Sequence, residues 1–467
     1  MKYCFTFLIL SFSFSFSIAQ EHEQKYFPVQ DTLVQQKLEE WQDYKFGLLM
    51  HWGPYSQWGV VESWSICPED EDWCRRRGEF ANDYYGYVKA YERLQTTFNP
   101  TKFDPEKWAL AAKNAGMKYV VFTTKHHDGF CMFNSSQTDY SVTNDNCPFS
   151  RNEKSNVTLQ VFNAFRNQGI WTGAYFSKPD WHHPDYWDPA FPPYDRNPNY
   201  DPAKKPEKWK SYVEFTQNQI LELLTNYGKV DLLWLDGGWV QPFTETSPKW
   251  GYKPMHQDIG LDSLVVKARK LQPGLIVVDR AVEGPNQNYL TPEQKIPNEP
   301  LPYPWESCMT MGDSWSYVPN DNYKSTKTLL TNLCLIVSRG GNYLLNVAPD
   351  ANGEWDSIAY QRLEEIGAWM KINSEAIYNT KPVAPYEQEA GSGKWIFTEE
   401  KHGARYAIFI PNEKTTKTVK LDLSVFPDYR VRTATCLKNG AVTKVKGRFV
   451  ELKVGGKDEI LVWKLVG

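Results

Sequence analysis

The chain has 467 residues, a formal net charge of −4 and 23% charged residues. This length is too great for a typical single domain and predicts two domains. The nearly balanced charge gives no reason to expect nucleic acid or an anionic membrane as a partner. The aromatic share of 15% is high, and most of these rings must pack the core of a folded protein.

The N-terminus has the pattern of a secretion signal. Lys2 supplies a short positive region, residues 5–18 are apolar and rich in serine, and Ala19 ends a small-residue cleavage site. The apolar run is too short for a membrane span, and no later stretch approaches about 18 uninterrupted apolar residues. We therefore expect a cleavable signal peptide over residues 1–19 and a secreted or periplasmic protein without a membrane span.

Short apolar runs alternate with helical patterns after residue 40. The helical patterns cover residues 105–115, 159–168, 208–227 and 261–271. The strand-like runs cover residues 46–51, 119–124, 172–177, 230–236, 275–279 and 343–347. Apolar strands separated by helices indicate a parallel sheet covered by helices. Six or more such units favour a (β/α)8-like barrel, which we place over residues 20–383.

The pattern changes after residue 383. Short strand-like runs follow one another with turn signals between them and without a convincing helix, at residues 395–398, 406–410, 416–423, 434–436 and 460–464. This pattern of short strand-like runs and turns is typical of antiparallel sheets. The fold class is therefore α/β, a barrel followed by a C-terminal antiparallel β-sandwich over residues 384–467.

Polar and aromatic side chains lie at or near the C-terminal ends of five of the predicted strands. The active site of a (β/α) barrel lies at the C-terminal ends of its strands, so we expect these side chains to converge. They are His51, His126 with His127, Tyr175, Asp236 and Arg280. Such a set suits a sugar, whose hydroxyls need polar partners and whose apolar face packs on aromatic rings.

Asp236 has the strongest functional pattern of these residues. An aspartate at a strand end can simply cap the next helix. The two glycines and two tryptophans that flank Asp236 favour close approach of a ligand instead. His126 and His127 are adjacent, so on a strand they would point to opposite faces and could hardly share a metal. We therefore expect no metal and no cofactor.

Ordered motifs along the chain resemble those of glycoside hydrolase family 29. They are HWGPYS at 51–56, FDPEKWA at 103–109, KHHDGF at 125–130, GAYFS at 173–177, LLWLDGGW at 232–239, PWESC at 304–308, SWSY at 314–317 and GGNYLLNVAPD at 340–350. The resemblance runs through most of residues 36–380 and implies α-L-fucosidase activity, a (β/α) barrel and a C-terminal β-sandwich. It implies an oligosaccharide or polysaccharide as the partner.

The resemblance also implies roles for individual residues. Asp236 would be the catalytic nucleophile of a retaining, exo-acting enzyme. The residues that would bind the sugar are His51, Glu62, His126, His127, Tyr175, Trp234, Arg280 and Trp315.

The second catalytic carboxyl is the acid/base. The WESC-type motif points to Glu306, with Glu299 and Glu283 as alternatives in the same part of the chain. A retaining glycosidase needs its two carboxyls about 5–5.5 Å apart, and the acid needs a raised pKa. Trp305 and Trp315 would supply apolar surroundings for Glu306.

Two other functions remain open at this point. L-Galactose differs from L-fucose by a hydroxyl at C6, so an α-L-galactosidase acting on algal-type galactans by the same mechanism is an alternative. A catalytically inactive carbohydrate-binding protein on the same scaffold is a second one. The motifs do not encode the linkage, the aglycone or the oligomeric state.

Overall fold

We describe a computed structural model of the chain, which covers residues 24–69, 74–245, 247, 252–401, 403–415 and 417–467. The predicted signal peptide and its cleavage site lie outside these residues. Within them, no helix combines the length and apolar character needed to cross a membrane.

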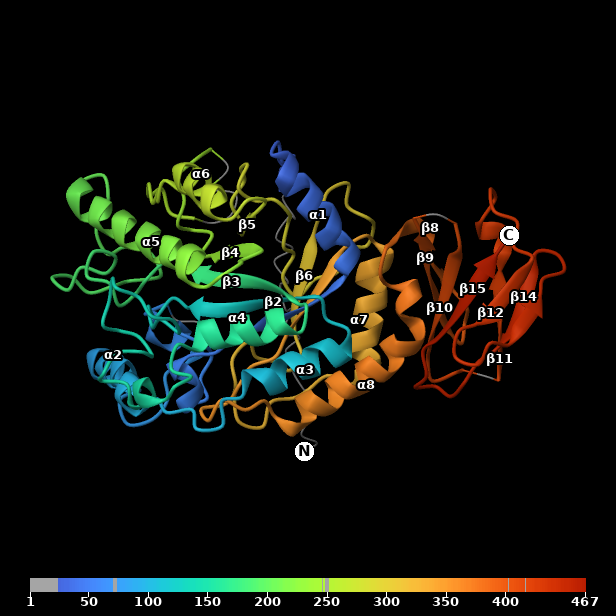
Figure 1. Ribbon diagram of the computed structural model, residues 1–467, viewed down its shortest axis with the longest axis horizontal. Coiled ribbons are helices and arrows are strands. Elements are labelled where there is room, and N and C mark those ends of the chain that lie inside the picture. Colours follow the sequence, from blue (N-terminus) through green and yellow to red (C-terminus); the bar gives the residue numbers. More distant parts are fainter. Residues whose placement is uncertain (1–23, 70–73, 246, 248–251, 402, 416) are drawn as a thin grey trace, which may run out of the picture.

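The first part of the chain forms a curled parallel sheet surrounded by helices (Figure 1). Its seven strands have the order β5-β4-β3-β2-β1-β7-β6. Their bounds are Phe46–Met50 (β1), Tyr119–Lys125 (β2), Trp171–Ser177 (β3), Leu232–Asp236 (β4), Ile276–Asp279 (β5), Glu306–Thr310 (β6) and Asn342–Asn346 (β7). The expected barrel architecture is confirmed. The six expected strands match β1 to β5 and β7, whereas β6 was not among them.

Eight helices accompany this sheet among the described residues. They are α1 (Thr32–Tyr44), α2 (Tyr84–Glu92), α3 (Pro105–Ala115), α4 (Val157–Asn167), α5 (Pro206–Asn226), α6 (Leu261–Leu271), α7 (Thr326–Ser338) and α8 (Ser357–Asn373). Helix α3 shows why these bounds could be predicted. The Asp104 side chain accepts from the Lys107 amide at its start, Pro105 opens the first turn, and Gly116 ends it with φ of 92°.

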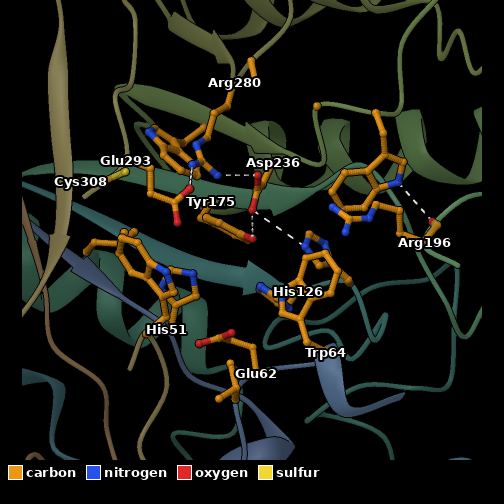
Figure 2. A pocket seen from close by; sticks show the side chains of 18 of the residues that line it. His51, Glu62, Trp64, His126, Tyr175, Arg196, Asp236, Arg280, Glu293 and Cys308 are labelled. Carbon is orange, nitrogen blue, oxygen red and sulfur yellow. Dashed lines mark hydrogen bonds and ion pairs between the residues drawn. The ribbon is translucent and has the colours of Figure 1, made fainter. Parts of the chain in front are cut away.

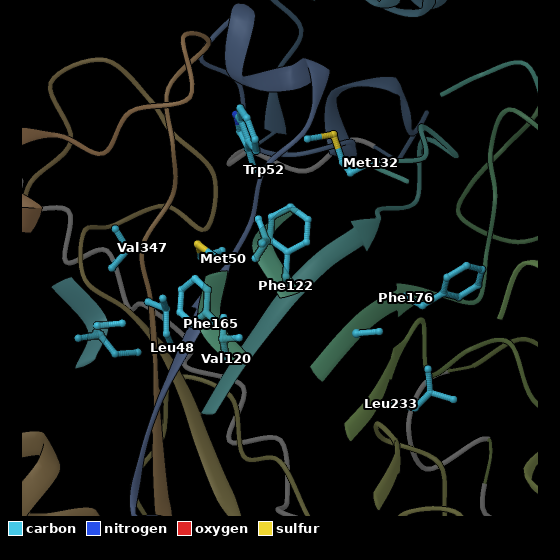
Figure 3. Close-up of a cluster of buried hydrophobic side chains, with 14 of the residues drawn as sticks. Leu48, Met50, Trp52, Val120, Phe122, Met132, Phe165, Phe176, Leu233 and Val347 are labelled. Atoms are coloured by element: carbon cyan, nitrogen blue, oxygen red, sulfur yellow. The ribbon is translucent and has the colours of Figure 1, made fainter. Parts of the chain in front are cut away.

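Alternate residues of each strand face two different cores. Leu48, Met50, Val120 and Phe122 point outward to the covering helices, as Figure 3 shows for this cluster. Their neighbours belong to a second cluster inside the barrel, which includes Leu49, Val121, Tyr175, Trp234 and Leu344. Burial on both faces explains the continuous apolar runs of these strands.

Helix α1 closes the lower end of the barrel, opposite the C-terminal ends of the strands. Trp41 belongs to the interior cluster and stacks on Tyr289 with ring centroids 4.0 Å apart. The Trp41 carbonyl accepts a hydrogen bond of 2.7 Å from Asn342 at the start of β7. The opposite end is therefore where a ligand can enter.

An irregular segment fills the gap between β5 and β6. Isolated bridges pair Val278 with Gln287, Leu290 with Trp305, and Glu293 with Cys308. The second and third of these bridges are parallel, so residues 290–293 run beside β6 where a further barrel strand would lie.

The last part of the chain folds into two antiparallel sheets. Six strands have the order β13-β12-β15-β10-β9-β8, and β11 pairs with β14. Their bounds are Thr380–Glu389 (β8), Gly393–Glu400 (β9), Arg405–Pro411 (β10), Thr418–Asp422 (β11), Thr433–Cys436 (β12), Val442–Lys444 (β13), Phe449–Lys453 (β14) and Leu461–Val466 (β15). The antiparallel C-terminal fold is confirmed. The predicted domain boundary after residue 383 falls within β8 and stays a prediction.

The larger of these sheets packs on the barrel with one face. Ile396, Ile408 and Val462 join the outer core of the barrel, whereas Trp395, Phe409 and Trp463 pack inside the sandwich. These aromatic residues are therefore core residues.

Candidate active site

A pocket of about 510 Å³ lies at the C-terminal ends of the barrel strands (Figure 2). It brings together nine of the predicted site residues, namely His51, Glu62, His126, His127, Tyr175, Trp234, Asp236, Arg280 and Trp315. The tenth, Glu306, does not line it. The volume is in the range of small-ligand sites.

Asp236 is the last residue of β4, and hydrogen-bond donors hold both of its oxygens. Tyr175 donates its hydroxyl to Oδ2 over 2.7 Å, while Arg280 donates to Oδ1 over 3.0 Å. The amide of Gly237 also donates to Oδ1. Burial alone would raise the pKa of Asp236, but Arg280 and these hydrogen bonds hold it well below its ordinary value. Asp236 is therefore an oriented, ionised carboxylate facing the pocket.

His51 follows β1 and presents a hydrogen-bond acceptor to the pocket. Its Nδ1 lies 2.9 Å from Oδ1 of Asn346, whose Nδ2 donates to the Trp315 carbonyl. This second bond sets the orientation of the amide, so Nδ1 of His51 must carry the proton. Burial lowers the His51 pKa to about 4. The ring is then neutral near pH 7, with a lone pair on Nε2.

His126 and His127 follow β2 and lie next to Asp236. Ser63 holds Nδ1 of His126 at 2.5 Å, and Nε2 of His127 is 4.0 Å from Oδ2 of Asp236. Burial lowers the pKa of both rings, that of His127 to about 3. Ligand atoms of the two histidines and Asp236 fall within 4.8 Å of one another. Since Tyr175 and Arg280 already bind Asp236, this arrangement suits sugar hydroxyls better than a metal ion.

Glu62 brings a second carboxyl to the pocket wall. It is 2% exposed, its Oε1 accepts from the Ser316 amide over 2.8 Å, and its own amide donates to the Ser316 hydroxyl. Burial raises the Glu62 pKa to about 8, and the nearby charge of Asp236 adds to the rise. Glu62 is therefore protonated near pH 7 and can donate a hydrogen bond.

Glu306 lies at the start of β6, below the pocket. It is fully buried and accepts hydrogen bonds from Tyr119, Tyr289 and Trp234. Cys308, two residues further along the same face of the strand, does line the pocket. The rise of about 3.3 Å per residue places Glu306 roughly 6–7 Å deeper than Cys308. This position disagrees with the acid/base role predicted for Glu306, because a leaving group in the pocket cannot reach it.

Glu293 is a pocket carboxylate that the sequence did not single out. It lies on the irregular segment beside β6, its side chain is 41% exposed, and it forms an ion pair with Arg280 (Figure 2). The predicted alternatives do not line the pocket, since Glu299 is exposed and Glu283 accepts from the Lys25 amide elsewhere. Several glutamates lie between β5 and β6, and no strand pattern marks the one that faces inward.

The inner end of the pocket is apolar. Leu49, Trp234 and Cys308 line it, and each is at most 2% exposed. They come from β1, β4 and β6, with their side chains inside the barrel. This end can therefore accept a methyl group but offers few partners to a hydroxyl.

Two tryptophans and an arginine form another part of the wall. The Arg196 guanidinium lies over the rings of Trp64 and Trp239, at 4.8 and 5.2 Å from their centroids. Glu69 accepts from Nε of Arg196 over 2.7 Å and holds the guanidinium in place. These residues were not among the predicted site residues, although Trp239 ends the LLWLDGGW motif and Trp64 lies two residues after the predicted Glu62.

Comparison with known proteins gives matches over most of the chain. The family model described as Alpha-L-fucosidase matches residues 13–375. The alpha-L-fucosidase of Dictyostelium discoideum is 28% identical over 400 residues, which cover 82% of this chain and 80% of that protein. The tissue alpha-L-fucosidase of Homo sapiens is 30% identical over 401 residues, covering 83% and 78% of the two chains.

Solved structures share the architecture as well. Alpha-L-fucosidase isoenzyme 1 from Paenibacillus thiaminolyticus has a TM-score of 0.73 and 29% identity, covering 93% of this chain and 99% of that one. The Thermotoga maritima alpha-fucosidase in complex with fucose has a TM-score of 0.68 and 25% identity, covering 92% and 98%. With the family model matching most of its length, the chain belongs to the alpha-L-fucosidase family of glycoside hydrolases.

Proposed function

We propose that this protein hydrolyses terminal α-L-fucosides with retention of configuration, using Asp236 as the nucleophile and Glu293 as the acid/base. The observation that carries this proposal is the contact of both carboxylates with Arg280 at the wall of one pocket. Contact with one guanidinium keeps the two carboxyls close, as the separation of about 5–5.5 Å in retaining glycosidases requires.

The two carboxylates differ in their exposure to solvent. Asp236 is 16% exposed and held ionised, whereas Glu293 is 41% exposed at the mouth of the pocket. In the first step, Asp236 attacks the anomeric carbon and Glu293 gives its proton to the departing oxygen. In the second step, Glu293 takes a proton from water, which displaces Asp236 and releases the sugar.

The remaining wall suits the hydroxyls of a single terminal sugar. His51 can accept a hydrogen bond from one sugar hydroxyl, and protonated Glu62 can donate a hydrogen bond to another. The apolar inner end formed by Leu49, Trp234 and Cys308 would hold the C6 methyl of fucose. This arrangement favours L-fucose over L-galactose, and the α-L-galactosidase alternative has no support in the comparisons.

Turnover of an aryl α-L-fucoside tests the proposal. We expect the wild-type protein to release the α-anomer of fucose first, as seen by proton NMR before mutarotation. Asp236→Asn should lower turnover by at least a thousandfold, because it removes the attacking group. Near-normal turnover by this variant would refute the nucleophile assignment. Tight fucose binding by the wild type without hydrolysis would instead identify a carbohydrate-binding protein.

A further inference from the structure

We propose that Glu306 is a positioning residue that fixes the indole of Trp234, and through it the groups that orient Asp236. The inference rests on the proposed hydrolysis of α-L-fucosides. It gives a function to the buried carboxyl that the catalytic mechanism leaves unused.

Three donors converge on the Glu306 carboxyl, and they account for both of its oxygens. Tyr119 donates to Oε2 over 2.6 Å, while Tyr289 and Trp234 donate to Oε1 over 3.2 and 3.3 Å. A carboxylate accepts all three bonds without offering a competing donor. Burial raises the Glu306 pKa to about 7, and these hydrogen bonds oppose the rise.

Trp234 is the member of this set that lines the pocket. Its indole N–H can only donate, so the position of Oε1 fixes the rotation of the ring. Tyr119 and Tyr289 are hydroxyl donors that can turn toward other acceptors, and they belong to the core below the pocket. Loss of the acceptor would therefore affect Trp234 most.

Two residues that bind Asp236 rest on the indole of Trp234. Tyr175 stacks on it with centroids 5.3 Å apart and planes 24° apart, and the Arg280 guanidinium lies 5.3 Å from its centroid. Tyr175 and Arg280 donate to different oxygens of Asp236. A rotation of Trp234 would thus disturb both donors at once. Cooperative contacts of this kind make a group below the pocket important for the geometry within it.

A double-mutant cycle between Glu306→Gln and Trp234→Phe tests the inference. Glutamine keeps the size of Glu306 but removes its charge, and phenylalanine keeps an aromatic ring but removes the N–H. We expect Glu306→Gln to lower kcat/KM about 5- to 10-fold, because the glutamine oxygen can still accept from Trp234 but the charge that strengthens this bond is removed. In the Trp234→Phe background, Glu306→Gln should change kcat/KM less than threefold, because phenylalanine has no N–H from which residue 306 could accept a hydrogen bond.

Three readouts separate positioning from other roles. The loss should be equal for activated aryl fucosides and natural fucosides, and azide should not restore it, because no proton reaches the leaving group from Glu306. Tyr289→Phe removes another donor to the same Oε1 and should keep kcat/KM within about threefold, which excludes a general effect of core disruption. Binding of a fucose-configured iminosugar, measured by calorimetry, should weaken in Glu306→Gln.

The outcomes decide the inference. Additive effects in the cycle, azide rescue of Glu306→Gln, or an equal loss in Tyr289→Phe would each overturn it. Absence of fucoside turnover and of iminosugar binding in the wild type would instead reject the proposed function itself. If Trp234→Phe does not fold, iminosugar binding by Glu306→Gln and the comparison with Tyr289→Phe decide the inference, and unchanged iminosugar affinity in Glu306→Gln would overturn it.

Discussion

Glu293 and Arg280 form an ion pair at the mouth of the pocket, so an exposed carboxylate of the site contacts the same cation as the buried Asp236. Arg280 is 18% exposed at its side chain and lies over the ring of Trp234. The pair keeps Glu293 directed inward although its segment has no regular hydrogen-bond ladder.

Replacing Glu293 by glutamine should affect substrates according to their leaving groups. For fucosides with poor leaving groups we expect kcat/KM to fall by about 10²- to 10⁴-fold, because general acid catalysis is lost. Activated aryl fucosides should lose much less in the first step, and azide should restore their turnover. The matched control is Glu299→Gln, an exposed glutamate of the same connection that does not line the pocket. A uniform loss for all leaving groups would count against Glu293 as the acid/base.

The pH dependence should show the ionisation of Glu62. Its pKa of about 8 means that the carboxyl is neutral near pH 7 and becomes a second anion near Asp236 as the pH rises. We expect kcat/KM to fall above about pH 8 in the wild type. Glu62→Gln should remove this alkaline decline, because an amide stays neutral. An unchanged decline in the variant would assign it to another group.

The raised pKa of Glu62 also predicts that the stability of the folded protein depends on pH. The folded protein holds a proton on Glu62 up to about pH 8, whereas an unfolded glutamate loses it near pH 4.5. Between these values the folded state binds more protons, so this contribution to stability decreases as the pH rises. The Tm of Glu62→Gln relative to the wild type should therefore increase from pH 5 to pH 9. A constant difference in Tm would contradict the raised pKa.

The apolar end of the pocket predicts discrimination at C6. We expect the wild type to prefer an aryl α-L-fucoside over the matching α-L-galactoside by up to about a hundredfold, since an apolar wall rejects an added hydroxyl only modestly. Cys308→Ala enlarges this end and should narrow the preference. Cys334→Ala, at a buried cysteine of α7 away from the pocket, should leave the ratio unchanged. Equal rates on both substrates in the wild type would show that C6 does not face this end.

A buried ion pair at the end of β2 should contribute strongly to stability. Nζ of Lys125 lies 3.0 Å from Oδ2 of Asp180, with side chains 0% and 2% exposed. Lys125→Met leaves Asp180 buried without its cation and should lower the free energy of unfolding by roughly 3–5 kcal/mol. Adding Asp180→Asn to this variant should restore part of the lost free energy of unfolding. Lys204 forms an exposed ion pair with Asp201, so Lys204→Met should change the free energy of unfolding little. If Lys204→Met caused a loss similar to that of Lys125→Met, burial of the pair would not explain the effect.

The sequence predicted those parts of the site that lie on regular strands. His51, Tyr175 and Asp236 could be identified because they lie at or near the ends of apolar runs, and parallel strands bring their C-terminal ends to one edge. The bounds of α3 were predictable from its capping residues. These signals are local, so a single sequence contains them.

The second carboxylate could not be identified in this way. Glu306 was chosen from the WESC-type motif alone, and no strand was predicted at this place, whereas Glu306 begins β6 and lies at the lower end of the barrel. Glu293 lies on a segment held by isolated bridges, next to Pro292 and without alternation of apolar residues. Its inward direction depends on Arg280 and on the neighbouring strand, which are contacts that only the folded chain provides.

The two proposed catalytic carboxyls are held by different kinds of structure, one by a regular strand and the other by the irregular segment beside β6. The proposed nucleophile, Asp236, ends a hydrogen-bonded strand, so its position cannot change without disturbing the neighbouring strands. The proposed proton donor, Glu293, lies on a connection whose length and course can vary while the strands stay in place. Exchanging this connection between relatives, with Arg280 kept, is therefore a direct way to engineer which leaving groups the enzyme accepts without redesigning its sugar pocket.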